Sequence, residues 1–275
     1  MDFGPDRRSA ASGLRQHPEY WCNMRVKAEG VVEFRIAIPA RYASERLPGK
    51  PLRKIHGRAM IEWVYRAAQQ AGAVEVVVAT DDKRIFDAVE DFGGRACMTA
   101  STHRSGTDRI LEVAKKLGWS DDSIVVNLQG DEPLMPAANI AQVAANLVSS
   151  DCAMATLHKP VDAHAAQDPN LVKLVHDQRG QALYFSRAPI PFDRSGAGGQ
   201  YFGHIGLYAY RVSFIEIFSG LEPCDLEIAE ALEQLRALCN GYRIHSEIAR
   251  ELPGPGIDTE ADLSEVTRLL EPKMP

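Results

Sequence analysis

Short runs of β-branched residues alternate with helix-like stretches from residue 34 onward, and this alternation limits the folds open to the chain more than any other feature. Strands are expected over residues 35–38, 74–79 and 123–128, and helices over 61–71 and 84–92. Such alternation is typical of a parallel sheet whose strands are joined by crossover helices. The sequence therefore predicts an α/β fold.

The later part of the chain continues the pattern less regularly. Further strands are expected over 153–157, 172–176, 206–210 and 242–248, and further helices over 139–148, 213–218, 226–238 and 261–270. Apolar residues recur every three positions from Leu226 to Leu238, which predicts one helix there with a buried stripe. Residues 34–275 are expected to form a single domain. Residues 1–33 contain glycine and proline without any periodicity, so they are expected to be a flexible N-terminal extension.

The formal net charge of −6 argues against a general nucleic-acid binder, because sequence-independent affinity for phosphate backbones comes from clustered Lys and Arg. Any anionic ligand must therefore meet a local basic site. No run approaches the ~20 apolar residues of a membrane span, and the N-terminus lacks the apolar core of a signal peptide. The expected location is cytoplasmic, without membrane insertion. The five cysteines form no CxxC pair, and their odd count predicts reduced thiols.

A basic loop follows the first expected strand. Its sequence, PARYASERLPGK, places Arg41, Ser44, Arg46 and Lys50 directly after Ala40. At the carboxyl end of a strand in an open α/β sheet, backbone N–H groups and cationic side chains can surround a polyphosphate. The loop matches neither the Walker A pattern nor GxGxxG. Two interpretations stay open here, a phosphate-binding loop and an ordinary solvated loop.

Carboxylates occupy two further positions of interest. Asp131 and Glu132 come just after the expected strand 123–128, and Asp258 lies in a Pro/Gly turn near the end of the chain. Carboxylates at a ligand crevice suit Mg²⁺, which takes one or two protein oxygens and completes its shell with water and phosphates. The alternative for Asp258 is an N-cap of the helix expected at 261–270.

Two polar clusters complete the candidates. Asp82 follows the expected strand 74–79, and Ser105, Gly106 and Thr107 open a helix. The N–H groups and hydroxyls at such a helix start can hold a ribose or a base. The alternative is helix capping by the two hydroxyl residues, with Asp82 solvated.

Taken together, these segments resemble the 3-deoxy-D-manno-octulosonate (Kdo) cytidylyltransferases of Gram-negative bacteria. The resemblance runs in order through residues 34–270 and is carried by PARYASERLPGKPL, VVVATDD, SGTDRI, VVNLQGDEPL, ALYFSRAPIPF, HIGLYAYR, LEQLRAL and PGIDT. It implies a Rossmann-like nucleotide-diphospho-sugar transferase fold, with a mixed, mostly parallel central sheet and flanking helices.

The family reaction implied by the resemblance is attack of the anomeric hydroxyl of Kdo on the α-phosphorus of CTP, which gives CMP-Kdo and pyrophosphate for lipopolysaccharide biosynthesis. It also implies Mg²⁺ as cofactor and a homodimer. Lys50, Arg46, Asp131 and Asp258 would be catalytic, with the two aspartates holding the metal. The nucleotide would contact Ala40, Arg41, Ser44, Arg46, Lys50, Asp82, Ser105, Gly106, Thr107 and Gln129. The sugar would contact Arg187, His204, Tyr208, Glu233 and Gln234.

Other interpretations remain at this point. A cytidylyltransferase for 8-amino-Kdo fits the same residues, whereas sialic acid enzymes have a different phosphate loop. A non-catalytic nucleotide-binding regulator is disfavoured because Lys50, Asp131 and Asp258 are all retained. Arg187 could instead pair with a structural acid. Glu45 and Cys239 depart from the family pattern.

Overall fold

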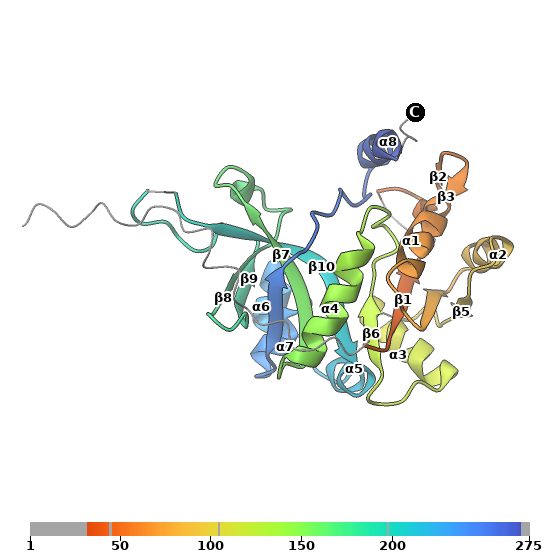
Figure 1. Cartoon of the computed structure of the whole chain (residues 1–275), viewed down its shortest axis with the longest axis horizontal. Coiled ribbons are helices and arrows are strands. Elements are labelled where there is room, and N and C mark those ends of the chain that lie inside the picture. Colours follow the sequence, from red (N-terminus) through yellow and green to blue (C-terminus); the bar gives the residue numbers. More distant parts are fainter. Residues whose placement is uncertain (1–31, 44–45, 104, 197, 271–275) are drawn as a thin grey trace, which may run out of the picture. The chain divides into compact units, whose positions relative to one another are not determined.

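The computed structural model describes residues 32–43, 46–103, 105–196 and 198–270. A mixed sheet lies at its centre, with the strand order β11-β7-β10-β6-β1-β4-β5, while β8 pairs with β10 and β9 with β8 (Figure 1). The strands are β1 (Phe34–Ala40), β4 (Glu75–Thr80), β5 (Ala96–Met98), β6 (Ile124–Asn127), β7 (Met154–Val161), β8 (Lys173–His176), β9 (Ala182–Ser186), β10 (Tyr201–Arg211) and β11 (Ile244–Ile248). A separate hairpin joins β2 (Lys54–Ile55) to β3 (Arg58–Ala59).

Along the strand order β10 is the strand that runs against its neighbours, and β11 is parallel to β7. Strand β1 runs parallel to β4 and β6, and β4 runs parallel to β5. Strand β10 is antiparallel to its neighbours β6, β7 and β8. The predicted fold class, a mixed sheet with flanking helices, is confirmed.

Helices cover both faces of the sheet because its central strands are apolar on both sides, as the nearly continuous burial of β4 and β6 shows. Ile36 and Ile38 belong to the core cluster under α1 (Met60–Gln69) and α4 (Ala137–Ser149). Ala37 points the other way, into the cluster under α3 (Gly106–Leu117) and α5 (Val212–Ser219). The remaining helices are α2 (Lys83–Asp91), α6 (Asp225–Glu230), α7 (Leu235–Cys239) and α8 (Glu260–Leu269). Short 3-10 turns span Lys50–Leu52 and Ala165–Gln167. None of the helices within the described ranges has both the length and the apolar character needed to cross a membrane.

The single helix predicted over 226–238 is wrong. The chain forms α6 and α7 instead, separated by Ala231, which adopts the left-handed conformation with φ 50°. Leu226 is 46% exposed, and α6 buries none of its residues. An exact three-residue period drifts around a helix of 3.6 residues per turn, so it cannot keep one face buried. Leu232 and Leu235 are buried because the break turns them inward.

The prediction of reduced thiols is also wrong for one pair. Cys224 and Cys239 form a disulfide that links the start of α6 to the end of α7. Cys97 and Cys152 are free. Cys22 and most of the predicted extension 1–33 fall outside the described residues, so that prediction stays untested. The chain from Val32 onward forms one contact unit.

Candidate active site

Three segments that are distant in the sequence meet at Lys50. Its Nζ donates to Asp131 Oδ2 at 2.6 Å, to the Ile257 carbonyl oxygen at 2.6 Å and to Asp258 Oδ1 at 2.9 Å. The preceding Gly49 has φ 65°, and a Cβ there would come within 3.1 Å of the Tyr42 ring. A glycine is therefore needed for the chain to turn and bring the lysine to the carboxylates.

Charge balance keeps Lys50 protonated. Burial alone would lower its pKa, but the charge and hydrogen bond of Asp131, followed by those of Asp258, raise the pKa above its usual value. Arg46 Nη2 lies 3.0 Å from Asp258 Oδ2 at the more exposed side of the cluster. The predicted catalytic residues Arg46, Lys50, Asp131 and Asp258 are thus brought together.

A helix cap does not explain Asp258. The N-cap of α8 is Thr259, whose hydroxyl accepts from the Asp262 N–H in a capping box. The Asp258 carboxylate instead meets Lys50 and Arg46. The alternative interpretation of Asp258 is therefore wrong.

A cavity of about 330 Å³ opens beside this cluster. Asp131, Glu132, Asp258, Lys159 and His204 line it, together with the segment 253–257. Burial, followed by the nearby charges of Asp131 and Asp258, raises the pKa of Glu132 to about 7. The part of this shift that comes from the two aspartates reflects negative charge, which a divalent cation would offset.

The donor set suits Mg²⁺ rather than a metal enclosed by protein ligands. Across the described ranges, no group of three or more His, Cys, Asp or Glu side chains lies close enough to hold a metal ion. Mg²⁺ needs only one or two carboxylates when phosphates and water complete its shell. Asp131 and Asp258 meet that requirement.

A second cavity, of about 250 Å³, lies over the basic loop. Its lining includes predicted nucleotide residues from three parts of the chain, namely Ala40, Arg41, Lys50, Gly106 and Gln129. Gly130 passes so close to β1 that a Cβ would lie 2.9 Å from the Pro39 carbonyl oxygen. The solvated-loop alternative does not account for this arrangement. Ser44 and Glu45 lie outside the described residues.

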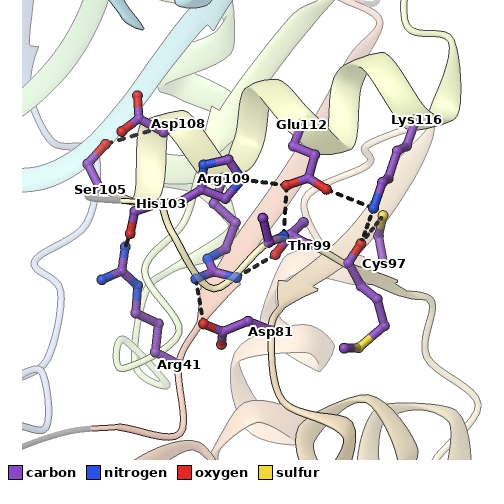
Figure 2. Close-up of polar contacts among 12 residues, drawn as sticks. Arg41, Asp81, Cys97, Thr99, His103, Ser105, Asp108, Arg109, Glu112 and Lys116 are labelled. Carbon is purple, nitrogen blue, oxygen red and sulfur yellow. Dashed lines mark hydrogen bonds and ion pairs between the residues drawn. The ribbon is translucent and has the colours of Figure 1, made fainter.

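The start of α3 contacts the basic loop on one side and the predicted sugar residues on the other. Ser105 caps the helix by accepting from the Asp108 N–H at 3.2 Å, and the Arg41 guanidinium donates to the His103 carbonyl at 2.8 Å (Figure 2). Thr107 is no cap, because its hydroxyl donates to Glu233 Oε2 at 3.1 Å. Predicted nucleotide and sugar residues therefore touch here.

Asp82 has another role. It is the N-cap of α2, and its carboxylate accepts from the backbone N–H and the guanidinium of Arg84. It is absent from the lining of both described cavities. Neither interpretation of Asp82 included capping of α2, and its contact with the nucleotide stays a prediction.

Two aromatic residues of β10 lie at the predicted sugar end. His204 lines the larger cavity, its Nε2 is 3.0 Å from Thr156 Oγ1, and burial lowers its pKa to about 3, so the ring is neutral. Tyr208 packs on that ring at 5.3 Å between centroids. Burial raises the pKa of Tyr208 well above its usual value, and its hydroxyl is buried without a partner among the described residues.

Gln234 shares this property, since its buried Nε2 has no partner within the described part of the chain. Burial raises the pKa of the neighbouring Glu233. Buried polar groups are normally satisfied. Tyr208 and Gln234 are therefore good candidates for contact with a polar ligand.

Arg187 binds backbone instead of facing a cavity. Its Nε donates to the Glu230 carbonyl at 2.7 Å, its Nη1 to Pro169 at 3.0 Å and its Nη2 to Ala231 at 3.4 Å. The carboxylate of Glu230 accepts from the Arg187 N–H at 2.8 Å. These contacts suit a structural role, with backbone carbonyls in place of the acid that the structural alternative supposed, and recognition of the sugar carboxylate stays a prediction.

Sequence reasoning missed the environment of Glu132. It also missed the pair formed by the buried Arg109 and the partly buried Asp81, whose Nη2 and Oδ2 are 3.0 Å apart. Both acids adjoin a predicted site residue, and Arg109 lies inside the SGTDRI motif. Their positions were visible, but their burial was not.

Comparisons with known proteins agree with this geometry. A family profile described as Cytidylyltransferase matches residues 36–244. The chain is 50% identical over 247 residues to a 3-deoxy-manno-octulosonate cytidylyltransferase of Vibrio campbellii, covering 87% of this chain and 98% of that one. It is 52% identical over 248 residues to the enzyme of the same name from Thioalkalivibrio sulfidiphilus, covering 87% and 99%.

Solved structures of similar fold include a named cytidylyl-sugar synthetase and a more distant nucleotidyltransferase. The structure of CMP:2-keto-3-deoxy-manno-octonic acid synthetase complexed with CTP matches with a TM-score of 0.82 and 45% identity, over 86% of this chain and 98% of that one. A thymidylyltransferase structure from Bacillus anthracis, at 14% identity and a TM-score of 0.61 over 88% and 97% of the two chains, shares the fold alone.

Proposed function

Because this chain belongs to the 3-deoxy-manno-octulosonate cytidylyltransferases, we propose that it transfers the cytidylyl group of CTP to Kdo, giving CMP-Kdo and pyrophosphate. The observation that carries the proposal is the junction of Lys50 with Asp131 and Asp258, directly beside the cavity of the basic loop. This transfer needs positioning and charge neutralisation more than a covalent nucleophile.

The cations of the basic loop serve the nucleotide. Lys50 and Arg41 both line the smaller cavity, where they neutralise phosphate charge. Arg46 stands on the outer side of Asp258, in reach of the leaving pyrophosphate. Each of these side chains binds and orients, and none forms a covalent bond to the substrate.

Asp131 and Asp258 would hold Mg²⁺, and their release from Lys50 would free oxygens for it. When bound, the metal supplies charge neutralisation at the phosphates and makes an adjacent hydroxyl more acidic. The support is the donor chemistry of the two carboxylates, which Lys50 holds together beside the larger cavity.

The sugar lies on the β10 side of the same carboxylates. His204 lines the cavity that Asp131 and Asp258 share, and it is neutral, so its ring donates from one nitrogen only. The buried hydroxyl of Tyr208 and the amide of Gln234 offer further hydrogen bonds to sugar hydroxyls.

We further propose a homodimer that works in the cytoplasm and supplies lipopolysaccharide biosynthesis. Two bulky apolar side chains near β9 are exposed, Leu183 at 62% and Phe192 at 86%. Single exposed apolar side chains are common on proteins, so the family resemblance carries the dimer and these two residues mark where it is tested. Sedimentation of the protein and of its Phe192→Ser variant tests this point.

A pyrophosphate-release assay tests the activity. CTP with Kdo should give Mg²⁺-dependent release that stops with EDTA, while ATP, GTP and UTP give little. Kdo, 8-amino-Kdo and a sialic acid are compared as acceptors. Equal rates with all nucleotides, or no release with any acceptor, would overturn the proposal.

A further inference from the structure

We propose that Arg109 is a positioning residue for the nucleotide end of this site: it fixes the segment that places Arg41 and the first turn of α3. The inference rests on the proposed function, because the nucleotide is CTP.

Arg109 is completely buried. Its Nη1 donates to Thr99 Oγ1 and its Nη2 donates to Asp81 Oδ2 at 3.0 Å, while its Nε has no partner among the residues described (Figure 2). A buried guanidinium is costly unless an anion and hydrogen bonds compensate it. The end of β4, the segment after β5 and helix α3 are therefore held together at one point.

The segment after β5 is also held from its outer side. Glu112 accepts from the Ala100 N–H at 2.9 Å and contacts the His103 ring, and Lys116 Nζ lies 2.7 Å from its other oxygen. Partial burial alone would raise the pKa of Glu112, but these three hydrogen bonds lower it to about 2. The carboxylate is therefore ionised at neutral pH.

The anchored segment ends at the nucleotide cavity. The His103 carbonyl accepts from Arg41 Nη2 at 2.8 Å, and Arg41 lines that cavity together with Gly106 at the start of α3. Arg41 is itself exposed, so this single bond directs a long and otherwise mobile side chain. A shift of the segment from Thr99 to His103 would move the cation and the helix start together.

The test uses two variants of different severity. Arg109→Lys keeps the charge but cannot reach both partners, and Thr99→Val removes one acceptor at nearly constant volume. Arg35→Lys is the matched control. Like Arg109, Arg35 contacts one carboxylate and one hydroxyl, those of Glu75 and Ser123, but it lies at the end of β1 away from the site.

CTP affinity by calorimetry, KM for each substrate and melting temperature are measured for all proteins. Arg109→Lys should raise Kd and KM for CTP at least fivefold, Thr99→Val should raise them two- to threefold, and KM for Kdo should change less than twofold. Arg35→Lys should lower the melting temperature while Kd for CTP stays within twofold of the parent.

Unchanged CTP affinity in a folded Arg109→Lys protein overturns the proposal and makes Arg109 purely structural. If that variant does not fold, Thr99→Val decides by the same criterion. A parent protein that does not bind CTP would instead overturn the proposed function, so the two failures are distinguishable.

Discussion

The ammonium group of Lys50 bonds the carboxylate of Asp131 at 2.6 Å, although 81 residues separate them in the sequence. The same nitrogen reaches Asp258, which lies 208 residues away. One lysine therefore holds two acids close together in a part of the molecule where their mutual repulsion would otherwise separate them. A cation that displaces the lysine from them meets a preformed pair of ligands.

The first prediction separates the two residues at the start of α8. Asp258→Asn should lose at least 100-fold in kcat, because charge neutralisation at the phosphates is lost, while its melting temperature stays close to that of the parent. Thr259→Ala should keep its turnover and lose about 0.5–2 kcal/mol of stability, because it removes the cap. Steady-state kinetics and thermal unfolding are measured on both variants. The reverse pattern would return Asp258 to a structural role.

Arg187→Lys should destabilise the protein by about 1–3 kcal/mol, because a lysine cannot serve the carbonyls of Pro169, Glu230 and Ala231 together. KM for Kdo and for CTP should then change by less than threefold when measured well below the melting temperature. A tenfold rise in KM for Kdo alone, without loss of stability, would show instead that Arg187 recognises the sugar carboxylate.

Stability should fall as the pH drops below 6.5. His158 is buried against His176 and near His245, and burial lowers its pKa to about 3. Between pH 6.5 and 3 the unfolded chain binds a proton at His158 and the folded chain does not. The free energy of unfolding is therefore highest above pH 6.5 and falls as the pH drops through this range.

Urea unfolding at pH 7 and pH 5 measures the effect. His158→Gln should reduce the difference in unfolding free energy between these pH values by about 2 kcal/mol. His164→Gln is the control, because His164 is exposed. Equal pH dependence in the parent and His158→Gln would contradict the prediction.

The disulfide between Cys224 and Cys239 closes a loop with a sequence separation of 15 residues. Loop closure of this length contributes about 3 kcal/mol in the chain-entropy description, so reduction should lower the melting temperature. Peptide mapping without reductant should recover the linked pair. Cys224→Ser should melt at the temperature of the reduced parent. Cys152→Ser is the control and should melt at the temperature of the oxidised parent, because Cys152 is free. Free thiols at both Cys224 and Cys239 in the unreduced protein would contradict the pairing.

Most strands and helices were predictable because their periods are local properties. The helix expected at 226–238 shows the limit, since its leucine spacing alone gave no sign of the left-handed Ala231. The hairpin of β2 and β3 was missed because two-residue strands leave no measurable alternation.

Some contacts of the site were predictable from the sequence and others were not. The carboxyl ends of β1 and β6 had to share one edge of the sheet, so the meeting of Lys50 with Asp131 was predictable in outline. The neighbours of Arg187 and Arg109 were not predictable, because a charged residue in the sequence looks the same whether it is solvated or buried. The family resemblance placed Glu233 at the sugar, which stays a prediction, and its hydrogen bond with Thr107 came only from the fold.

The left-handed conformation of Ala231 lets Glu230 and Glu233 contact different parts of the fold. In a continuous helix, Glu230 and Glu233 would lie on neighbouring turns and face the same surroundings. The break sends Glu230 to Ser186 and the Arg187 backbone, and Glu233 to Thr107 at the start of α3. One residue of unusual backbone conformation thus lets two acids three positions apart hold two different regions, the end of β9 and the start of α3. A change at Ala231 would therefore disturb both regions together.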